Sequence, residues 1–212
     1  MSPRWIAPSL AAALAAAPPL ATAQSTQEKA PRKMERKPAE PVKPEGLSTT
    51  PKPPAELAQL GWFSGTWRCQ GDVAASPMGP AHKSRATVMI RPDLGGYWFT
   101  GAVREDRTAD NPHPTSGMFH ETYDTGKKQF LMLWVDNHGG WATQTSRGWD
   151  GEKMVFEGEA ALGGQTQKTL ETFVKKGDRE LSRRFEIQTN GRWTTVAEDA
   201  CKKASAPGPP SQ

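Results

Sequence analysis

Apolar residues recur with strand-like patterns in ten short segments between residues 66 and 201. Each segment is rich in the β-branched and aromatic residues that favour strands. Turn-forming residues separate the segments, and Asp150-Gly151 and Asn190-Gly191 are strong hairpin signals. The pattern predicts strands over residues 66–73, 84–91, 97–105, 116–124, 129–136, 141–150, 153–160, 167–175, 180–188 and 193–201.

Only the segment PAELAQLGW, residues 54–62, has a helical pattern, with Pro54 at its start and Gly61 after its last leucine. About ten consecutive strands without crossover helices predict an all-β fold, either a barrel or a sandwich. We favour a single up-and-down antiparallel β-barrel with a short N-terminal helix. Closure into a barrel removes the free strand edges that promote aggregation.

The alternation shows which side chains share a face, because successive residues of a strand point to opposite sides. In QFLMLWVD, Phe130, Met132 and Trp134 share one face, but the opposite face is also apolar. In GMFHETYD, Phe119, Glu121 and Tyr123 share a face that mixes aromatic and acidic groups. Mixed faces are typical of a partly polar barrel interior or a ligand pocket. The alternative is a packed core with a wet outer face.

The composition divides the chain into four parts. Residues 1–23 have one positive charge, an apolar run from Ile6 to Ala17 and a final Ala-Thr-Ala, which predicts a secretory signal peptide. Residues 24–55 are rich in Pro and Lys and predict a disordered linker. Residues 56–204 have the size of one barrel domain, and 205–212 predict a disordered tail. These features predict a periplasmic or secreted protein.

The charge is distributed unevenly along the chain. The formal net charge is +4, but residues 56–212 contain nineteen Lys and Arg against nineteen Asp and Glu. The excess therefore precedes the domain, and we expect no nucleic acid as a partner. The apolar run of residues 6–17 is shorter than the ~20 residues of a membrane span, so no membrane span is expected.

The chain contains two cysteines, Cys69 and Cys201. Cys69 lies in the first predicted strand and Cys201 ends the last one. In a closed barrel with an even number of strands, the first and last strands are antiparallel neighbours. An oxidising compartment favours a bridge between such a pair. We therefore predict a Cys69 to Cys201 disulfide at the seam of the barrel, the alternative being two buried free thiols.

Several motifs in this chain resemble those of a known superfamily. The segment LGWFSGTWRCQGD resembles the opening strand of calycin barrels, which include lipocalin-like and nitrobindin-like proteins; Gly65, Thr66 and Trp67 match their Gly-x-Trp motif. The segments ETYDTGKKQFLMLWVDNHGG and GWDGEKMVFEGEA are similar to a secreted bacterial domain-of-unknown-function family within that superfamily. The resemblance implies a lipocalin-like barrel in which the tryptophan closes one end. It implies no chemistry.

The relation to nitrobindins raises a haem-binding alternative, because those barrels hold haem through a histidine on a late strand. The histidines here are His82, His113, His120 and His138, and only His120 falls within a predicted strand. A haem site would therefore depend on His120, so no cofactor is predicted. Histidine and cysteine spacings typical of metal sites are absent from the sequence, so no metal site is predicted either. Known nucleophile motifs are likewise absent, and an enzyme is not expected.

Two classes of function remain. The first is a non-catalytic binding protein that holds a small, mostly apolar ligand inside the barrel. The second is a structural or protein-interaction module of the cell envelope with a filled core. Aromatic and sulfur-containing side chains supply the apolar contacts of small-molecule sites. For the first class we predict a binding site formed by Trp98, Phe119, Tyr123, Phe130, Met132 and Trp134.

Overall fold

The computed structural model describes residues 52–76 and 79–205. The signal peptide, most of the linker and most of the tail that the sequence predicts lie outside these residues. Strands make up most of the described chain. They are β1 (Gly65–Val73), β2 (His82–Asp93), β3 (Trp98–Glu105), β4 (Ser116–Asp124), β5 (Gln129–Asp136), β6 (Trp141–Ser146), β7 (Trp149–Asp150), β8 (Lys153–Leu162), β9 (Gln165–Gly177), β10 (Glu180–Thr189) and β11 (Arg192–Lys203).

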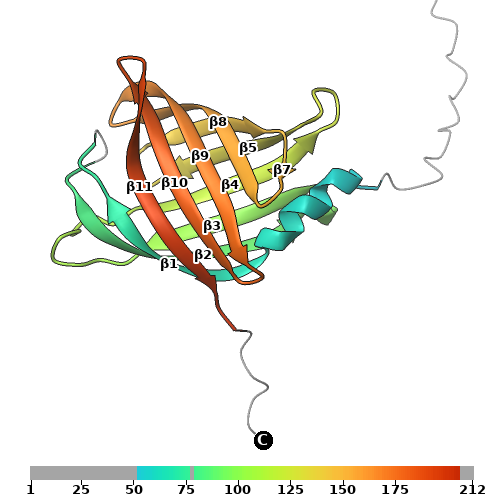
Figure 1. The fold of residues 1–212 in the computed structure, drawn as a ribbon, viewed down its shortest axis with the longest axis horizontal. Helices are drawn as coiled ribbons and strands as arrows, with labels where there is room; N and C mark the ends of the chain where they lie inside the picture. The colour runs from blue at the N-terminus through green and yellow to red at the C-terminus, as the bar shows by residue number, and fades with distance from the viewer. Residues whose placement is uncertain (1–51, 77–78, 206–212) are drawn as a thin grey trace, which may run out of the picture. The chain divides into compact units, whose positions relative to one another are not determined.

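The strands form a closed antiparallel barrel, as the succession of strands without crossover helices predicts (Figure 1). Neighbours in sequence pair with one another from β1 to β6 and from β8 to β11. Two further pairings, β1 with β11 and β6 with β8, close the ring of ten strands. The two-residue strand β7 is an addition that pairs only with β8. The prediction of an all-β, up-and-down barrel of about ten strands is confirmed.

The seam between β1 and β11 carries the predicted disulfide. Cys69 lies directly opposite Cys201 in the register of the two strands. Their Cα atoms are 4.0 Å apart, and the sulfur atoms are bonded. The bridge therefore joins the first and last strands of the barrel, close to the end at which Trp67 lies.

The predicted helix is present, but as the 3₁₀ helix η1 (Ala55–Phe63). Its buried residues are Leu57, Leu60 and Phe63, which recur every third position. A 3₁₀ helix has three residues per turn, so this spacing places all three side chains on one face. That face lies against one end of the barrel, which η1 crosses in Figure 1.

The η1 end of the barrel is sealed by aromatic side chains. Trp67 is 1% exposed, and its Nε1 donates a hydrogen bond of 2.7 Å to the carbonyl of Phe63. The Phe63 ring stacks on Trp149 at 5.2 Å and meets Phe173 edge-on. The Trp149 Nε1 donates to the carbonyl of Gln59 at 3.1 Å. We call this region, built by η1 and the rings packed beneath it, the capped end.

The core inside the barrel consists of two apolar clusters. The larger cluster includes the capped end and residues such as Phe130, Met132 and Phe156. The smaller cluster, with Phe185 and Ile187, lies towards the opposite end. Trp134 contacts both clusters. The interior side chains that lie between the clusters therefore determine what the middle of the barrel can hold.

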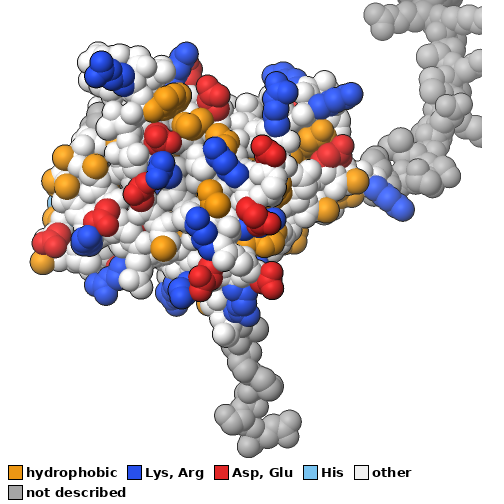
Figure 2. Space-filling model, viewed as in Figure 1, with side chains coloured by type: hydrophobic (Ala, Val, Ile, Leu, Met, Phe, Trp, Pro, Cys, Tyr) orange, Lys and Arg blue, Asp and Glu red, His pale blue; other side chains and the backbone are white. Residues whose placement is uncertain are grey.

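The outer wall formed by β9 to β11 carries interspersed charges of both signs (Figure 2). Two exposed ion pairs cross this wall, Arg184 with Glu198 at 2.6 Å and Lys202 with Glu180 at 3.0 Å. This agrees with the charge balance of the domain sequence. Within residues 52–76 and 79–205, no helix has the length and apolar character needed to cross a membrane.

Candidate binding site in the barrel interior

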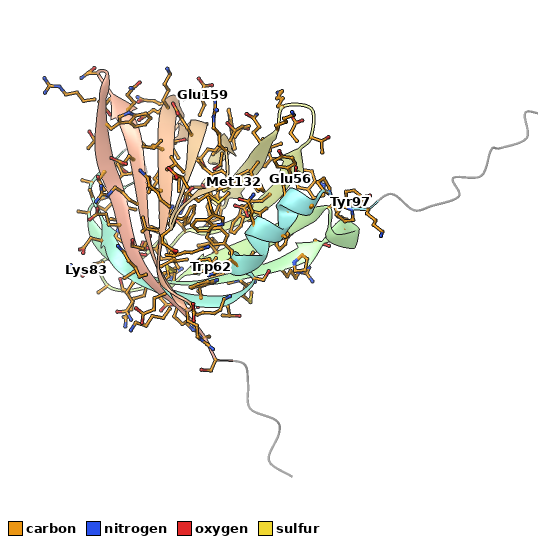
Figure 3. The ribbon with its side chains drawn as sticks, turned by 45° about the vertical axis from the view of Figure 1, so that its right-hand side comes forward. Glu56, Trp62, Lys83, Tyr97, Met132 and Glu159 are labelled. Carbon is orange, nitrogen blue, oxygen red and sulfur yellow. A yellow bond between two sulfur atoms is a disulfide. The ribbon has the colours of Figure 1, made fainter. Side chains whose placement is uncertain are left out.

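Five of the six predicted ligand-binding residues point into the barrel. The larger core cluster includes Phe119, Phe130 and Met132 as buried members, with Tyr123 and Trp134 packed against it. They come from the neighbouring strands β4 and β5, and Tyr123 meets Phe130 edge-on at 5.1 Å. Figure 3 shows Met132 within the barrel.

The sixth predicted residue, Trp98, lies on the outer face. The register places it on the same side of β3 as the exposed Arg104, opposite to the inward Phe99. Its ring contacts His120 edge-on at 6.5 Å. Trp98 therefore does not join the other five.

Two glycines on the wall let the large rings lie flat against it. A Cβ at Gly101 would lie 1.9 Å from the ring of Phe119, and one at Gly117 would lie 2.2 Å from the ring of Trp134. Phe119 lies directly opposite Gly101 on the neighbouring strand, and Trp134 lies diagonal to Gly117. The rings thus occupy the space of a missing side chain and extend less far towards the barrel axis.

A charged network crosses the interior beside these aromatic residues. Arg183 points inward from β10, between Leu181 and Phe185. Its Nε donates to Glu171 at 2.5 Å, and its Nη1 donates to Asp199 at 2.8 Å. Burial disfavours the charge of Arg183, but Glu171 and Asp199 outweigh this effect and raise its pKa. The three strands β9, β10 and β11 are therefore joined inside the barrel.

Two neutral polar side chains form a separate hydrogen bond inside the barrel. Gln144 of β6 is 1% exposed and donates a hydrogen bond of 2.9 Å to the hydroxyl of Thr169 on β9, which is fully buried. We call the inward-facing set of Glu121, Gln144, Thr169, Glu171, Arg183 and Asp199 the polar layer. Its members come from five strands and lie at or between the two apolar clusters.

Glu121 is the exceptional member of the polar layer. It is 4% exposed, and no described residue forms a hydrogen bond or an ion pair with its carboxyl group. Burial, and to a smaller extent the charge of Glu171, raise the pKa of Glu121 to about 8. Buried carboxyl groups in proteins are normally paired or hydrogen-bonded. Glu121 is therefore a polar group available to another molecule.

Several inward-facing side chains keep accessible surface although the wall is closed. Val88, Val103 and Trp134 point towards the larger cluster and are only partly buried. Arg183 lies deep in the interior, yet 30% of its side-chain surface is exposed. These side chains face inward, so their accessible surface lies inside the barrel or at its uncapped end.

Sequence reasoning identified the aromatic residues but not the polar layer. A signal for it exists: Glu121, Glu171 and Arg183 each stand two positions from apolar or aromatic residues on their own strand face. A charge at the centre of an otherwise apolar face either pairs inside the fold or binds a ligand. The partners of each charge lie on other strands, however, so the sequence does not tell these two cases apart.

Three of the four histidines lie on the outer face or in exposed loops, whereas His82 lies on the inward face of β2, at the end of the barrel opposite the capped end. His120 points outward from β4, where its Nδ1 is 3.2 Å from the Thr100 hydroxyl. His82 contacts Glu105 at 3.0 Å near the start of β2, and His113 and His138 are exposed. Since His120 faces outward, it cannot ligate a group held inside the barrel. Among the described residues, no three His, Cys, Asp or Glu side chains form a metal-binding group.

Two shallow hollows also occur on the surface, each of about 550 Å³. The first, beside Trp62, is lined by Lys175 and Lys176 and also by Glu152 and Asp178. The second lies at the outer ends of β1 and β2 and also mixes both signs of charge. Their opposite charges offset one another, so neither hollow has the unpaired charge found at Glu121.

Comparison with known proteins supports the fold. The crystal structure of Rv2717c from M. tuberculosis aligns with a TM-score of 0.56 and 12% identity, over 73% of this chain and all of that one. A protein of unknown function from the DUF3598 family of Nostoc punctiforme PCC 73102 matches 71% of this chain and all of its own, at 9% identity. Its TM-score of 0.20 is too low to compare the two folds. None of the curated protein sequences matches this chain. The family described as protein of unknown function (DUF1579) matches residues 52–203, and the chain therefore belongs to that family.

Proposed function

We propose that the protein binds a small ligand with a mostly apolar body inside its barrel and has no catalytic role. One observation carries this proposal: inward-facing side chains such as Val88, Val103 and Trp134 remain partly accessible inside a closed wall. A packed core excludes voids larger than a water molecule. Accessible apolar surface in the interior is what a small-molecule site requires.

The aromatic face of β4 and β5 provides the contacts for the ligand body. Phe119, Tyr123, Phe130, Met132 and Trp134 lie on adjacent strands within the larger cluster. Aromatic rings offer large contact areas at small entropic cost, and the polar layer offers groups that orient a ligand. Trp98, on the outer face, has no part in this site.

The experiment compares two phenylalanine substitutions on β3. Val103→Phe fills interior space, whereas Ala102→Phe places the same ring on the outer face, because successive residues of a strand point to opposite sides. The probe is the uncharged fluorescent compound N-phenyl-1-naphthylamine. We expect binding by the wild type and by Ala102→Phe, and at least tenfold weaker binding by Val103→Phe. Equal binding by all three proteins would contradict an interior site.

A second measurement addresses natural ligands. Protein produced with its own N-terminal segment is denatured, and the released molecules are identified by mass spectrometry. A compound present in stoichiometric amount with the wild type, and depleted in Val103→Phe, supports interior binding. Release of nothing above background by protein that also fails to bind the fluorescent probe supports a filled core.

We further propose that the protein works in the periplasm or outside the cell, and that its barrel is of the calycin type. The predicted signal peptide of residues 1–23 supports export, and the disulfide at the barrel seam is compatible with it. The position of Trp67 under a short helix supports the calycin relation, because the resemblance implies a tryptophan that closes one end.

One observation favours the second candidate function, an interaction module. Met89, Met118, Val135 and Trp141 are 44% to 55% exposed and form a row across neighbouring strands, with Ala102 between the first two. Strands are spaced by about 4.8 Å, so the row spans about 20 Å. A row one residue wide covers only part of the ~800 Å² that each partner buries in a standard interface, so neighbouring surface would have to join it, and a second copy of the chain is the occupant that we test.

The test for this module is the mass in solution measured by light scattering. If the row is a dimer interface, Met118→Glu lowers the mass from that of a dimer to that of a monomer, whereas the exposed control Lys202→Glu does not. A monomeric wild type at high protein concentration would contradict the dimer.

A further inference from the structure

The charges of the polar layer do not balance. It contains three carboxyl groups, those of Glu121, Glu171 and Asp199, and one guanidinium group, that of Arg183. Arg183 binds both Glu171 and Asp199. Its charge is therefore already shared between two acids, and Glu121 is left without a cationic partner among the described residues.

The surroundings of Glu121 are aromatic and apolar. Its neighbours on the adjoining strands are Phe99 and Met132, and Phe119 and Tyr123 lie on the same face of β4. The charged groups that face it from across the interior are Glu171 and, bound to it, Arg183. A carboxyl group in such a place is costly to ionise unless a positive charge comes close to it.

A cation bound in the interior would meet two kinds of favourable partner. The carboxylate of Glu121 would supply a charge-assisted contact, and the surrounding ring faces attract positive charge. An apolar body attached to that cation would contact the aromatic face of β4 and β5. We propose that the ligand of the barrel is an organic cation, an amine with an apolar body, whose charged group pairs with Glu121. This inference rests on the proposed function of interior ligand binding.

Binding of such a ligand is coupled to a proton. The pKa of Glu121 is raised to about 8, so the free protein holds a proton on this group at pH 7. The cation favours the ionised form, and the proton must therefore leave for the solvent as the ligand binds. The affinity rises with pH up to about 8 and then levels off, while an uncharged ligand shows no such rise.

The experiment uses three compounds that share an eight-carbon chain: n-octylammonium, 1-octanol and octanoate. Isothermal titration calorimetry measures their binding to the wild type. We expect octylammonium to bind at least tenfold more tightly than octanol, and octanoate to bind more weakly than both. Titrations in two buffers of different ionisation enthalpy should show release of close to one proton per octylammonium bound at pH 7.

The key variant is Glu121→Gln, which keeps the size of the side chain and removes its charge. It should bring the affinity for octylammonium down to that for octanol and abolish proton release. The control is Glu159→Gln, which removes the same charge from an exposed position on β8 and should behave as the wild type does. Figure 3 shows Glu159 at the edge of the barrel, away from Met132.

The pH dependence in the wild type provides a second test that needs no variant. Octylammonium affinity should increase about tenfold from pH 6 to pH 7, while octanol affinity stays constant. Equal affinities for the amine and the alcohol, without proton release, would overturn the cation inference. Interior binding would then still stand if the uncharged fluorescent probe binds and Val103→Phe prevents it. Failure of all three compounds and of that probe would overturn both proposals.

Discussion

The capped end and the polar layer are both built from inward-facing side chains, but they treat polar groups differently. At the capped end, polar groups find partners: the Nε1 atoms of Trp67 and Trp149 donate to carbonyl groups of η1. The Lys203 Nζ donates to the carbonyl of Trp62 at 2.9 Å. In the polar layer, the Glu121 carboxyl group has no such partner among the described residues.

This difference distinguishes the packed capped end from the part of the interior in which we propose that a ligand binds. Satisfied polar groups among close-packed rings stabilise a fold and leave nothing for a ligand. An unpaired buried carboxyl group lowers the stability of the folded chain. A group of this kind is expected at a functional site, where local rules of folding are broken.

The largest effect is expected from Trp67→Ala at the capped end. Trp67 is 1% exposed, so its removal leaves a large cavity under η1. The free energy of unfolding should fall by about 4 kcal/mol, measured by urea denaturation. The control is Trp193→Ala, because Trp193 is 37% exposed and its loss should cost less than about 1 kcal/mol. Similar losses for both variants would show that the capped end has no special role in stability.

The ionisation of Glu121 in the polar layer should make the free energy of unfolding depend on pH. The pKa of Glu121 is raised in the folded protein, so between about pH 4.5 and 8 the folded chain keeps a proton that the unfolded chain has released. Stability contributed by this group is therefore present at low pH and is lost as the pH rises through that window. The wild type should lose about 3 kcal/mol more than Glu121→Gln between pH 5 and pH 8.

This comparison is made by urea denaturation of both proteins at the two pH values. The difference between the proteins is the relevant quantity, because Glu105 has a lowered pKa, through hydrogen bonds that outweigh its burial, and contributes with the opposite sign. Parallel pH dependences would mean that Glu121 ionises normally in the folded state, and the contrast with the capped end would disappear.

A smaller effect is expected from Arg183→Ala. The substitution leaves Glu171 and Asp199 without their shared partner, which should cost about 2 kcal/mol after allowance for the 30% exposure of Arg183. The neighbouring Arg184 points outward and pairs with Glu198, each side chain being more than half exposed. Arg184→Ala should change the unfolding free energy by less than about 1 kcal/mol. Equal costs would indicate that the interior network contributes no more than a surface pair.

Strand periodicity predicts most of this fold. Strands β4 and β5 have the predicted bounds, because turn residues flank both of them directly. The predicted strand over residues 141–150 instead divides into β6 and β7. Gly148 separates the two strands, and its φ of +95° is a backbone conformation that other residues rarely adopt. The predicted helix has 3₁₀ geometry, which agrees with the spacing of three residues between its buried apolar side chains.

The residues of the candidate site were harder to predict, because the sequence does not show which face of each strand turns towards the barrel interior. QFLMLWVD is apolar on both faces, so its sequence does not show that Met132 points inward and Leu133 outward. Trp98 has the residue type of a binding site but stands on the opposite face from Phe99. Whether a charge on an apolar face finds a partner depends on strands far away in sequence. Arg183 has such a partner in Asp199, whereas Glu121 has none among the described residues.

The disulfide at the seam also makes the barrel a covalent ring. Cys69 and Cys201 are separated by 132 positions, so nearly the whole wall lies between the two bonded sulfur atoms. A protease that cuts one hairpin loop opens this ring but releases no fragment, because the two new ends stay joined through the bridge. All strands then remain parts of one covalent molecule, although the two strands on either side of the cut are no longer joined by their loop.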